Sequence, residues 1–547
     1  MACSITNHNI YIQIMKKIIS IVMVALMAFN ASAAGTIPVK KMPLAKVETF
    51  KTARAVEIND EINYDEPEGE FAVMCKDADA FKLDFSSAVH SKVYGSALST
   101  VTDGETLYFS NPIAEYPVFN WAKATIDGDK IIYQGAQAIA TTWDDNDDEV
   151  TLYLLPLLLQ IDEATQQGTY IADPDMTYEL VKGEDGAYHC TDATKLLGVC
   201  YMLGESDNIE WAWTGYGDRD ITISEITSKP VEVPETAEKG LWVWNANYTS
   251  RAVSVAIDGN DIYVAGMDPA IKDAWVKGSI ADGKAVFPSG QYLGVNEELC
   301  NLSYFFGAIV KEGTDEYGDV CFTGELTDQI VFNYDAENEQ LLTEGENGYA
   351  INGSPTHQYV LKAFANVLIV NQHRNPETIP AAPYDLIWQS SELGNALWFQ
   401  LPNTDIDGNL LKEDNLYYEF FVNGELYTFS PDDYYDLTEA TTRIPYNLDG
   451  YDFYVYEEDH TVYFYFDDFE TLGVRSAYLN EDNNWIYSET VSITNAGVND
   501  ILSGRDIISE ECFDTTGLRI HSETKGIQIV KTTYSDGTVR VSKRIVR

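Results

Sequence analysis

The chain has 547 residues, a formal net charge of −52 and a hydrophobic fraction of 45%. So negative a chain repels phosphate backbones, which argues against nucleic acid as a partner. The acidic residues are dispersed and the hydrophobic fraction is high, so we expect a folded protein with an acidic surface rather than a disordered acidic tail. At roughly 150 residues per domain, the length corresponds to three or four domains.

The first residues carry the pattern of a secretory signal peptide. Met15-Lys16-Lys17 is a basic start, residues 18–29 are an apolar run interrupted only by Ser20, and residues 31–33 are a small-residue cleavage site. We predict that residues 1–33 are this signal and that Met15 is the true start. The apolar run is shorter than the roughly 20 residues that cross a bilayer. No later segment qualifies, so we expect a secreted or cell-surface protein without a transmembrane segment.

Tight-turn dipeptides punctuate the whole chain. Asp-Gly and Asn-Gly tolerate the positive φ angles of hairpin turns, and they recur here between short β-branched or aromatic runs. Residues 124–126 precede Asp127-Gly128 and residues 130–133 follow it, and Asn423-Gly424 is framed in the same way. Long helical periodicity is missing after the signal. The pattern predicts an all-β, antiparallel fold.

An internal repeat organises the first two thirds of the chain. Residues 103–108 match residues 258–263, and residues 121–128 match residues 275–283, at an offset of 154 to 155 positions. A period this long indicates duplicated domains rather than a solenoid, whose units span about 20–50 residues. We therefore predict two tandem β-rich repeat units, and their ranges are 67–229 and 240–374.

Three further segments complete the predicted organisation. Residues 34–66 are polar and acidic and are predicted to form a flexible arm. Residues 384–494 contain roughly seven to nine strand-like runs, which suits an immunoglobulin- or fibronectin-like β-sandwich. Residues 498–547 are predicted to be a small C-terminal β module with a basic end.

The chain resembles a family of secreted Bacteroidetes proteins of the Bacteroides and Prevotella kind. The matching motifs are Pro67-Glu68-Gly69-Glu70, residues 274–278 and residues 287–294. Residues 380–493 resemble the fibronectin-like module that often follows in that family, through motifs such as Ile444-Pro445-Tyr446. The resemblance implies export and this domain order, and it implies no particular activity.

The end of the chain is similar to the C-terminal sorting domain of the type IX secretion system. Residues 513–520 and 525–529, followed by a basic finish, carry this similarity. In that family the tail directs passage across the outer membrane. The resemblance therefore implies that the secretion machinery is a partner of residues 498–547.

Sequence motifs of catalysis are scarce. The chain has no HExxH, no G-x-S-x-G, no P-loop and no GxGxxG. A glycosidase needs two carboxylates about 5–10 Å apart, and 87 acidic residues offer many pairs without singling one out. We therefore expect a non-catalytic extracellular protein that binds a glycan or a protein. The alternatives are an extracellular hydrolase using paired carboxylates in the repeat units, and a purely structural or adhesive protein.

One loop imitates a calcium site, although no other cofactor is expected. Oxygen-bearing side chains alternate around a glycine that permits a sharp turn, as hard-oxygen coordination of calcium requires. The candidate ligands are Asn403, Asp405, Asp407, Asn409 and Asp414. An ordinary Asp-Gly loop between strands is the alternative.

Two pairs of tryptophans are candidate ligand-binding residues. Trp211 and Trp213 are two positions apart, as are Trp242 and Trp244, so each pair faces one side of a strand. If exposed, such a pair could stack on sugar rings or contact a protein. If buried, it belongs to the core, where large aromatic residues usually lie.

Export permits disulfide bonds. Among the cysteines that follow the signal, Cys190 with Cys200 and Cys300 with Cys321 are the plausible local pairs.

Overall fold

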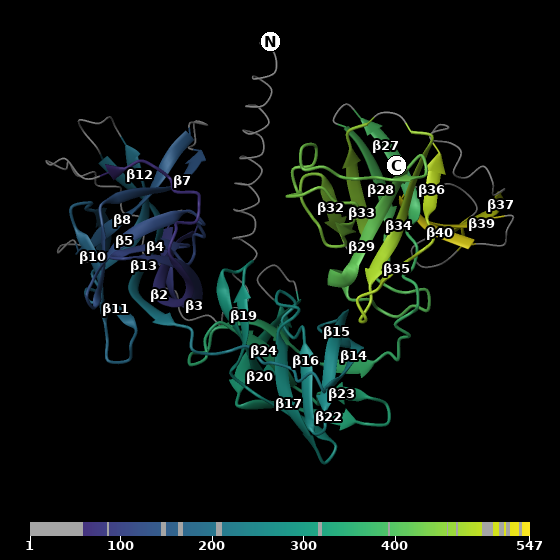
Figure 1. Cartoon of the computed structure of the whole chain (residues 1–547), viewed down its shortest axis with the longest axis horizontal. Helices are drawn as coiled ribbons and strands as arrows, with labels where there is room; N and C mark the ends of the chain where they lie inside the picture. The colour runs from purple at the N-terminus through teal and green to yellow at the C-terminus, as the bar shows by residue number, and fades with distance from the viewer. Residues whose placement is uncertain are drawn as a thin grey trace, which may run out of the picture. The chain divides into compact units, whose positions relative to one another are not determined.

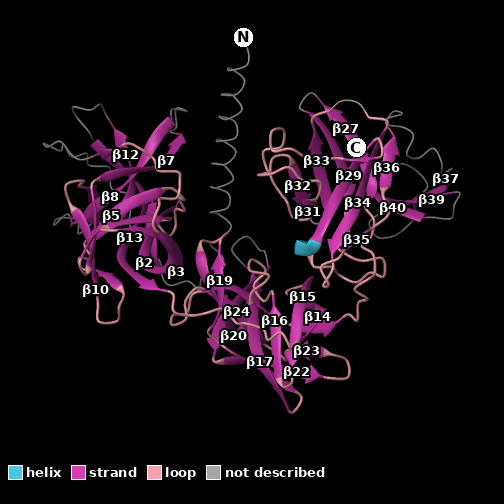
Figure 2. Cartoon of the chain, in the orientation of Figure 1, coloured by secondary structure: helices cyan, strands magenta, loops and turns pink. Residues whose placement is uncertain are grey.

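The computed structural model describes residues 58–546, with short gaps at 85–86, 144–148, 162–167, 204–209, 315–319, 392–393, 457, 467–468, 495–506, 514–518, 521–525 and 535–538. The predicted signal peptide and most of the predicted arm lie outside the described residues. The all-β prediction is confirmed, because the described elements are strands apart from one short 3-10 turn, Glu413–Asn415 (Figures 1 and 2). The chain forms two compact units, Met1–Asn371 and Gln372–Arg547.

Predicted turn dipeptides connect neighbouring antiparallel strands. Asp103 pairs with Thr106 across Gly104, whose φ is +60°. Asn423 and Gly424 have φ angles of 54° and 83° and join strands that pair Val422 with Glu425. Positive φ at both central residues is the geometry of a tight hairpin turn, which explains why Asn-Gly stands there.

Eight strands of the first unit pair into a closed ring. The last of them returns to pair with the first, so that Ile223 lies opposite Lys76. In ring order, the strands of this first barrel are β2 (Glu70–Asp84), β3 (Ser87–Asp103), β4 (Thr106–Ser110), β5 (Trp121–Asp127), β6 (Lys130–Gln134), β10 (Thr177–Lys182), β11 (Tyr188–Cys190) and β13 (Glu210–Glu225).

A second closed barrel follows in the same unit. Its strands are β14 (Glu238–Ala246), β15 (Thr249–Asp258), β16 (Asp261–Ala265), β17 (Trp275–Ala281), β18 (Lys284–Pro288), β22 (Gln329–Asp335), β23 (Gln340–Leu342) and β26 (Leu368–Asn371). The order of pairing is the same as in the first barrel. Strands β5 and β17 also share one alternation of buried and exposed side chains, as do β6 and β18.

Apart from β1, which precedes the first barrel, the remaining strands of this unit are inserted at matching points of the two barrels. Beside the first barrel lie β1 (Ile58–Asn59), β7 (Ala136–Trp143), β8 (Glu149–Ile161), β9 (Gly168–Ala172) and β12 (Lys195–Leu203). Beside the second lie β19 (Gln291–Asn296), β20 (Asn301–Thr314), β21 (Val320–Thr327), β24 (Asn347–Asn352) and β25 (Val360–Phe364). Strand β20 meets β3 where Asn301 pairs with Ser96, and the Ala97 amide donates to the Cys300 carbonyl at 2.8 Å.

The second unit contains two sheets with a shared core. One sheet has the order β27 (Tyr384–Ser391), β28 (Gly394–Gln400), β33 (Asp459–Phe464) and β32 (Phe453–Tyr456). The other has the order β30 (Glu425–Leu426), β29 (Leu416–Val422), β34 (Thr471–Leu479) and β35 (Trp485–Tyr487), with β31 (Ile444–Pro445) on β29 and β36 (Val491–Thr494) on β34. Phe399 of the first sheet packs edge-on against Tyr418 and Phe420 of the second, which makes a β-sandwich.

A small sheet ends the chain. Its strand order is β38 (Arg519–Ile520), β37 (Ile507–Phe513), β39 (Gly526–Tyr534) and β40 (Val539–Val546). Across the described parts of the chain, no helix has the length and apolar character needed to cross a membrane.

Candidate functional site

The outward face of the sheet β27–β28–β33–β32 carries aromatic side chains. We call Tyr384, Ile387, Trp398, Tyr454, Tyr456 and Tyr463 the tyrosine face. All of them are at least partly exposed, and Tyr454 and Tyr456 are 52% and 62% exposed. The solvent side of an antiparallel sheet is ordinarily polar. An aromatic face is therefore a departure that folding alone does not require.

Strict alternation along each strand produces this face. In β32, Phe453 points into the core, while Tyr454 and Tyr456 point out. In β33, Val462 points into the core and Tyr463 points out. Because side chains alternate with a period of two, the Phe and Val residues build the sandwich core and the Tyr residues cover its outer surface.

The strand register aligns these side chains in rows. Ile387 lies opposite Trp398, Trp398 opposite Thr461, and Thr461 opposite Tyr454. With strands about 4.8 Å apart, three such steps span roughly 14 Å. The row is therefore long enough to contact an extended ligand that lies across the strands.

Polar groups border the tyrosine face. The Gln400 amide donates to the Asp459 carboxylate at 2.9 Å, and the Tyr384 hydroxyl donates to Glu458 at 3.4 Å. Partial burial and the Glu458 carboxylate raise the pKa of Tyr384, so its hydroxyl stays protonated at neutral pH. The face thus combines flat apolar rings with amide, carboxylate and hydroxyl groups at its edge.

Exposed tyrosines continue past the end of β33. The Tyr465 hydroxyl donates to the Asp452 carboxylate, which also accepts from the Tyr435 amide at 2.5 Å. Burial raises the pKa of Asp452, and the neighbouring Asp436 carboxylate adds to this. Both carboxylate oxygens of Asp452 accept hydrogen bonds. We therefore interpret Asp452 as a structural residue that connects the segments around Tyr435 and Tyr465.

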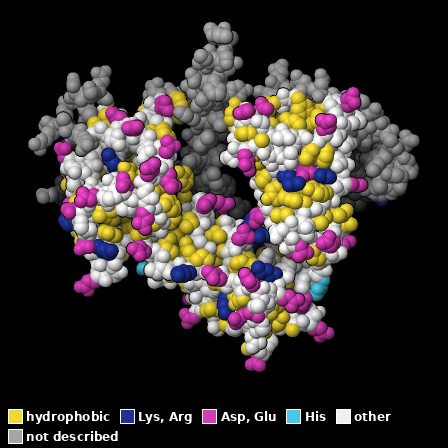
Figure 3. Space-filling view, in the orientation of Figure 1, with side chains coloured by type: hydrophobic (Ala, Val, Ile, Leu, Met, Phe, Trp, Pro, Cys, Tyr) yellow, Lys and Arg dark blue, Asp and Glu magenta, His cyan; other side chains and the backbone are white. Residues whose placement is uncertain are grey.

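The outer face of the opposite sheet has a different character. Glu419 is buried and accepts from Arg443 at 2.9 Å and from Arg475 at 2.6 Å. The two guanidinium groups stack on aromatic rings, Arg443 on Trp485 at 4.2 Å and Arg475 on Tyr487 at 4.0 Å. Figure 3 shows dark-blue side chains among hydrophobic ones over β29, β34 and β35. These charges pair within the sheet, so we interpret this face as a stabilising cation–π stack.

The tryptophan candidates lie in the cores of the two barrels and their adjoining strands. Trp242 and Trp244 are 3% and 0% exposed, and Trp211 is 7% exposed. Trp213 is partly exposed, but it packs edge-on against Phe81 and Tyr170, and its indole N–H donates to the Tyr216 carbonyl at 2.8 Å. An exposed stacking surface made of these four residues is therefore not present, because the strands turn them inward.

The calcium candidate is organised by protein donors. One oxygen of Asp405 accepts from the backbone amides of Asp407 and Asn409 at 3.0 and 2.9 Å, and the other accepts from Arg374 Nε at 3.0 Å. The Asn403 side-chain amide donates to Glu413 at 3.1 Å. Asp414 lies in the short turn that follows. Within the described ranges, no group of three or more His, Cys, Asp or Glu side chains is arranged to hold a metal ion.

Comparisons with known proteins give no family. No family model and no curated protein matches the chain. Among solved structures, the chain is similar to an extracellular domain assigned to a hybrid two-component system of B. thetaiotaomicron, at 8% identity and a TM-score of 0.10 over 76% of this chain and 97% of that one. An extracellular domain assigned to a one-component system of the same organism gives 10% identity and a TM-score of 0.09, over 84% and 99% of the two chains. No common fold follows from such scores.

The sequence analysis did not predict the tyrosine face. Its signal is the alternation of inward Phe or Val with outward Tyr in residues 453–456 and 462–465. Each run predicts a strand, but only the pairing of β32 with β33 places their tyrosines on one surface.

Proposed function

We propose that the protein is a non-catalytic extracellular binding protein and that its tyrosine face holds a neutral glycan. The observation that carries this proposal is the row of Ile387, Trp398, Thr461 and Tyr454 on the solvent side of a sheet. Sugar rings present C–H groups on their faces and hydroxyls at their edges. Flat aromatic rings match the former, and a rim of amides and carboxylates matches the latter.

Charge selects among glycans. The chain carries a net charge of −52, and Asp459 and Glu458 border the face itself. Uronic or sulfated sugars would be repelled, since like charges brought together at a surface disfavour association. We therefore expect neutral polysaccharides to bind and anionic ones to be rejected.

The test is a glycan array followed by calorimetric titration of the best neutral ligand. Tyr454→Ala and Trp398→Ala should each weaken binding about tenfold, or ~1.4 kcal/mol. Tyr248→Ala is the matched control, because Tyr248 is the most exposed tyrosine of the second barrel and lies outside the face. Binding that survives both face substitutions, or an array without neutral ligands, would overturn the proposal.

The alternatives are separated in the same experiment. Release of reducing sugar from bound glycans would favour the hydrolase. Capture of a protein without any glycan signal would favour an adhesive role.

We propose that the protein is exported to the cell exterior. The signal at residues 1–33 and the sorting-like segment at residues 498–547 would direct this export. N-terminal sequencing of the exported protein should find Ala34 or a neighbouring residue at its start. Removal of residues 498–547 should leave the protein inside the outer membrane if the secretion machinery recognises that segment.

A further inference from the structure

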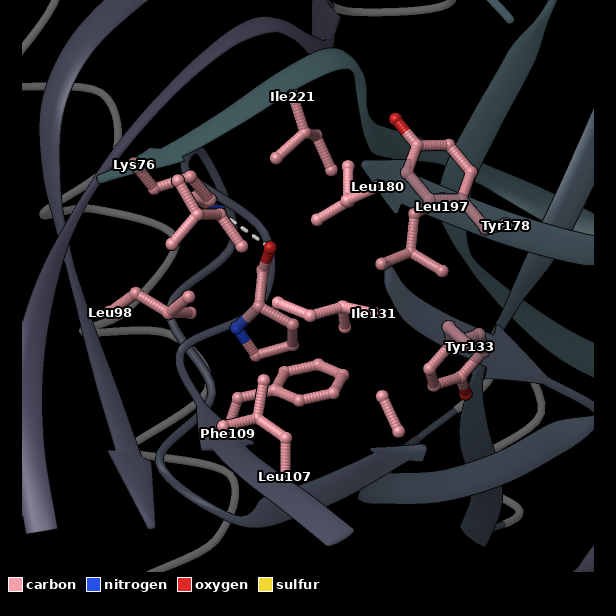
Figure 4. A pocket seen from close by; sticks show the side chains of 13 residues that line it. Lys76, Leu98, Leu107, Phe109, Ile131, Tyr133, Tyr178, Leu180, Leu197 and Ile221 are labelled. Carbon is pink, nitrogen blue, oxygen red and sulfur yellow. Dashed lines mark hydrogen bonds between the residues drawn. The ribbon is translucent and has the colours of Figure 1, made fainter. Parts of the chain in front are cut away.

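The closed interior of the first barrel is too small for an organic ligand. Its cavity measures about 40 Å³ and is lined mainly by apolar side chains, among them Leu98, Phe109, Ile131 and Leu180 (Figure 4). One buried water needs roughly 10–15 Å³ of such room, so the space corresponds to about three water molecules. An eight-stranded barrel is just wide enough for its side chains to fill. We therefore expect organic molecules to bind at the surface of the protein.

Three exposed tyrosines gather just past the tyrosine face of the second unit. Tyr435, Tyr451 and Tyr465, which we call the three-tyrosine cluster, are 67%, 43% and 52% exposed. The rings of Tyr435 and Tyr451 stand edge to face, with centroids 6.1 Å apart and planes at 82°. Partial burial raises the pKa of Tyr465, and the Asp452 carboxylate and the phenols of Tyr451 and Tyr435 add to this effect. Each of these groups therefore lies near the Tyr465 hydroxyl.

Neighbouring side chains that point in opposite directions place these rings on the surface. Tyr434 is fully buried among the aromatic side chains of the sandwich core, and the next residue, Tyr435, points to solvent. The segment that carries Tyr451 comes close to Tyr435 at Gly450, where a Cβ atom would lie 2.4 Å from the Asp436 carboxyl carbon. Glycine at this position therefore allows the two segments, and with them the two rings, to meet.

A buried carboxylate connects the cluster. Asp452 is fully removed from solvent and accepts from the Tyr435 backbone amide at 2.5 Å and from the Tyr465 hydroxyl. Its own backbone amide donates to the Asp436 carboxylate at 2.6 Å. Among the ion pairs of the described residues, none joins either carboxylate to a Lys or Arg. The cluster therefore combines open aromatic rings with negative charge that no described side-chain cation offsets.

We propose that the three-tyrosine cluster binds a small organic cation with an alkylated ammonium group, for which choline is the probe. The face of an aromatic ring carries the negative side of its quadrupole, so it attracts a cation within about 6 Å of the ring centroid. Methyl groups on the nitrogen suit exposed rings, because they contact ring carbons and leave the charge weakly hydrated. The carboxylates of Asp436 and Asp452 add attraction of the same sign, and the net charge of −52 draws cations to the chain.

The experiment titrates the full chain with choline and with 3,3-dimethylbutan-1-ol, by calorimetry and by ligand-observed NMR. The second compound is the neutral analogue of choline, with a carbon atom in place of the nitrogen. Choline should bind saturably, and the neutral analogue should bind about tenfold more weakly or not at all.

Variants of the cluster separate the rings from their hydroxyls. Tyr435→Ala and Tyr451→Ala should each weaken choline binding about fivefold. Tyr435→Phe keeps the ring and the backbone amide that donates to Asp452, so it should bind choline like the native chain. Tyr248→Ala is the control, because it removes an exposed tyrosine of the second barrel, and it should also bind like the native chain.

Four results would overturn the proposal. The absence of saturable choline binding is the first, and equal affinity for the neutral analogue, which would remove the role of the cation, is the second. The third is unchanged choline binding after both alanine substitutions, which would show attraction to the net charge alone. The fourth is loss of binding in a folded Tyr435→Phe protein, which would assign the interaction to the hydroxyl. Choline binding is measured directly, so these outcomes do not depend on whether the tyrosine face binds a glycan.

Discussion

Arg374 Nε donates to Asp405 Oδ2 across 3.0 Å, and both side chains are almost fully removed from solvent. The same guanidinium reaches Glu481 at 3.1 Å and stacks on Tyr478 at 4.9 Å. The loop that imitates a calcium site therefore encloses an arginine. A guanidinium supplies the positive charge that the buried carboxylate requires.

The first prediction concerns this ion pair. Arg374→Met leaves the Asp405 carboxylate buried and unpaired, and should lower the free energy of unfolding by about 3–5 kcal/mol. Thermal or urea unfolding of the second unit measures the loss. Calcium and a chelator should leave the melting temperature of the native chain unchanged. A calcium-dependent rise of several degrees would contradict this view of the loop.

A second prediction contrasts two tryptophans. Trp244→Ala removes a fully buried ring and should destabilise the chain by about 3–5 kcal/mol. Trp398→Ala removes a partly exposed ring of the tyrosine face, so its main effect should be on glycan affinity. Unfolding curves and titrations of both variants separate stability from binding. If a fully folded Trp244→Ala protein lost glycan binding, the tryptophan pairs would be favoured as the ligand-binding residues instead of the tyrosine face.

These tryptophans also mark the limit of sequence reasoning. The Asp-Gly and Asn-Gly turns predict hairpins because positive φ is a local property, and the all-β fold follows from them. Spacing of two shows that Trp242 and Trp244 share a side of a strand, but which side is inward depends on closure of the barrel through β26. The arginine beside the calcium candidate could not be foreseen for a similar reason, since Arg374 is 31 positions away from Asp405.

A third prediction concerns acid stability. Burial alone would raise the pKa of Asp79, but hydrogen bonds from His90 at 2.9 Å and from Arg219 at 2.6 Å outweigh it and lower the pKa. The unfolded carboxyl titrates near about 3.9. The stabilising contribution is therefore complete above that pH and is lost as the pH falls through the lower, folded pKa.

Asp79→Asn should accordingly lower stability at pH 7 and flatten the decline of stability below about pH 4. Melting temperatures measured in steps from pH 7 to pH 2 test this. Asp185→Asn is the control, because Asp185 also faces a histidine, His189 at 3.0 Å, but is exposed. Parallel pH profiles for the native chain and Asp79→Asn would show that the cluster does not titrate as proposed.

The last prediction concerns the cysteines, for which the expected local disulfides are not formed. Cys75, Cys190, Cys200, Cys300 and Cys321, the cysteines whose side chains are described, are free thiols. Cys200 belongs to the core cluster around Phe81, whereas Cys190 packs against a different cluster. Cys321 pairs with Gly313, twelve residues beyond Asn301 on β20 (313 − 301). That separation is roughly 40 Å at the rise of a strand, so Cys300 is out of reach.

The extent to which each cysteine is alkylated should therefore depend on how deeply its thiol is buried. Burial raises the pKa of the Cys75 thiol to about 12, with the Asp77 carboxylate adding to the effect, and burial raises that of Cys200 further. Since the thiolate is the reactive form, iodoacetamide at pH 8 should leave both unmodified in the native chain and label both in denaturant. Mass spectrometry of tryptic peptides distinguishes these states. Cys200 found linked to Cys190 in the unreduced protein would contradict the structure, because joining them requires the strand β12 to leave its core.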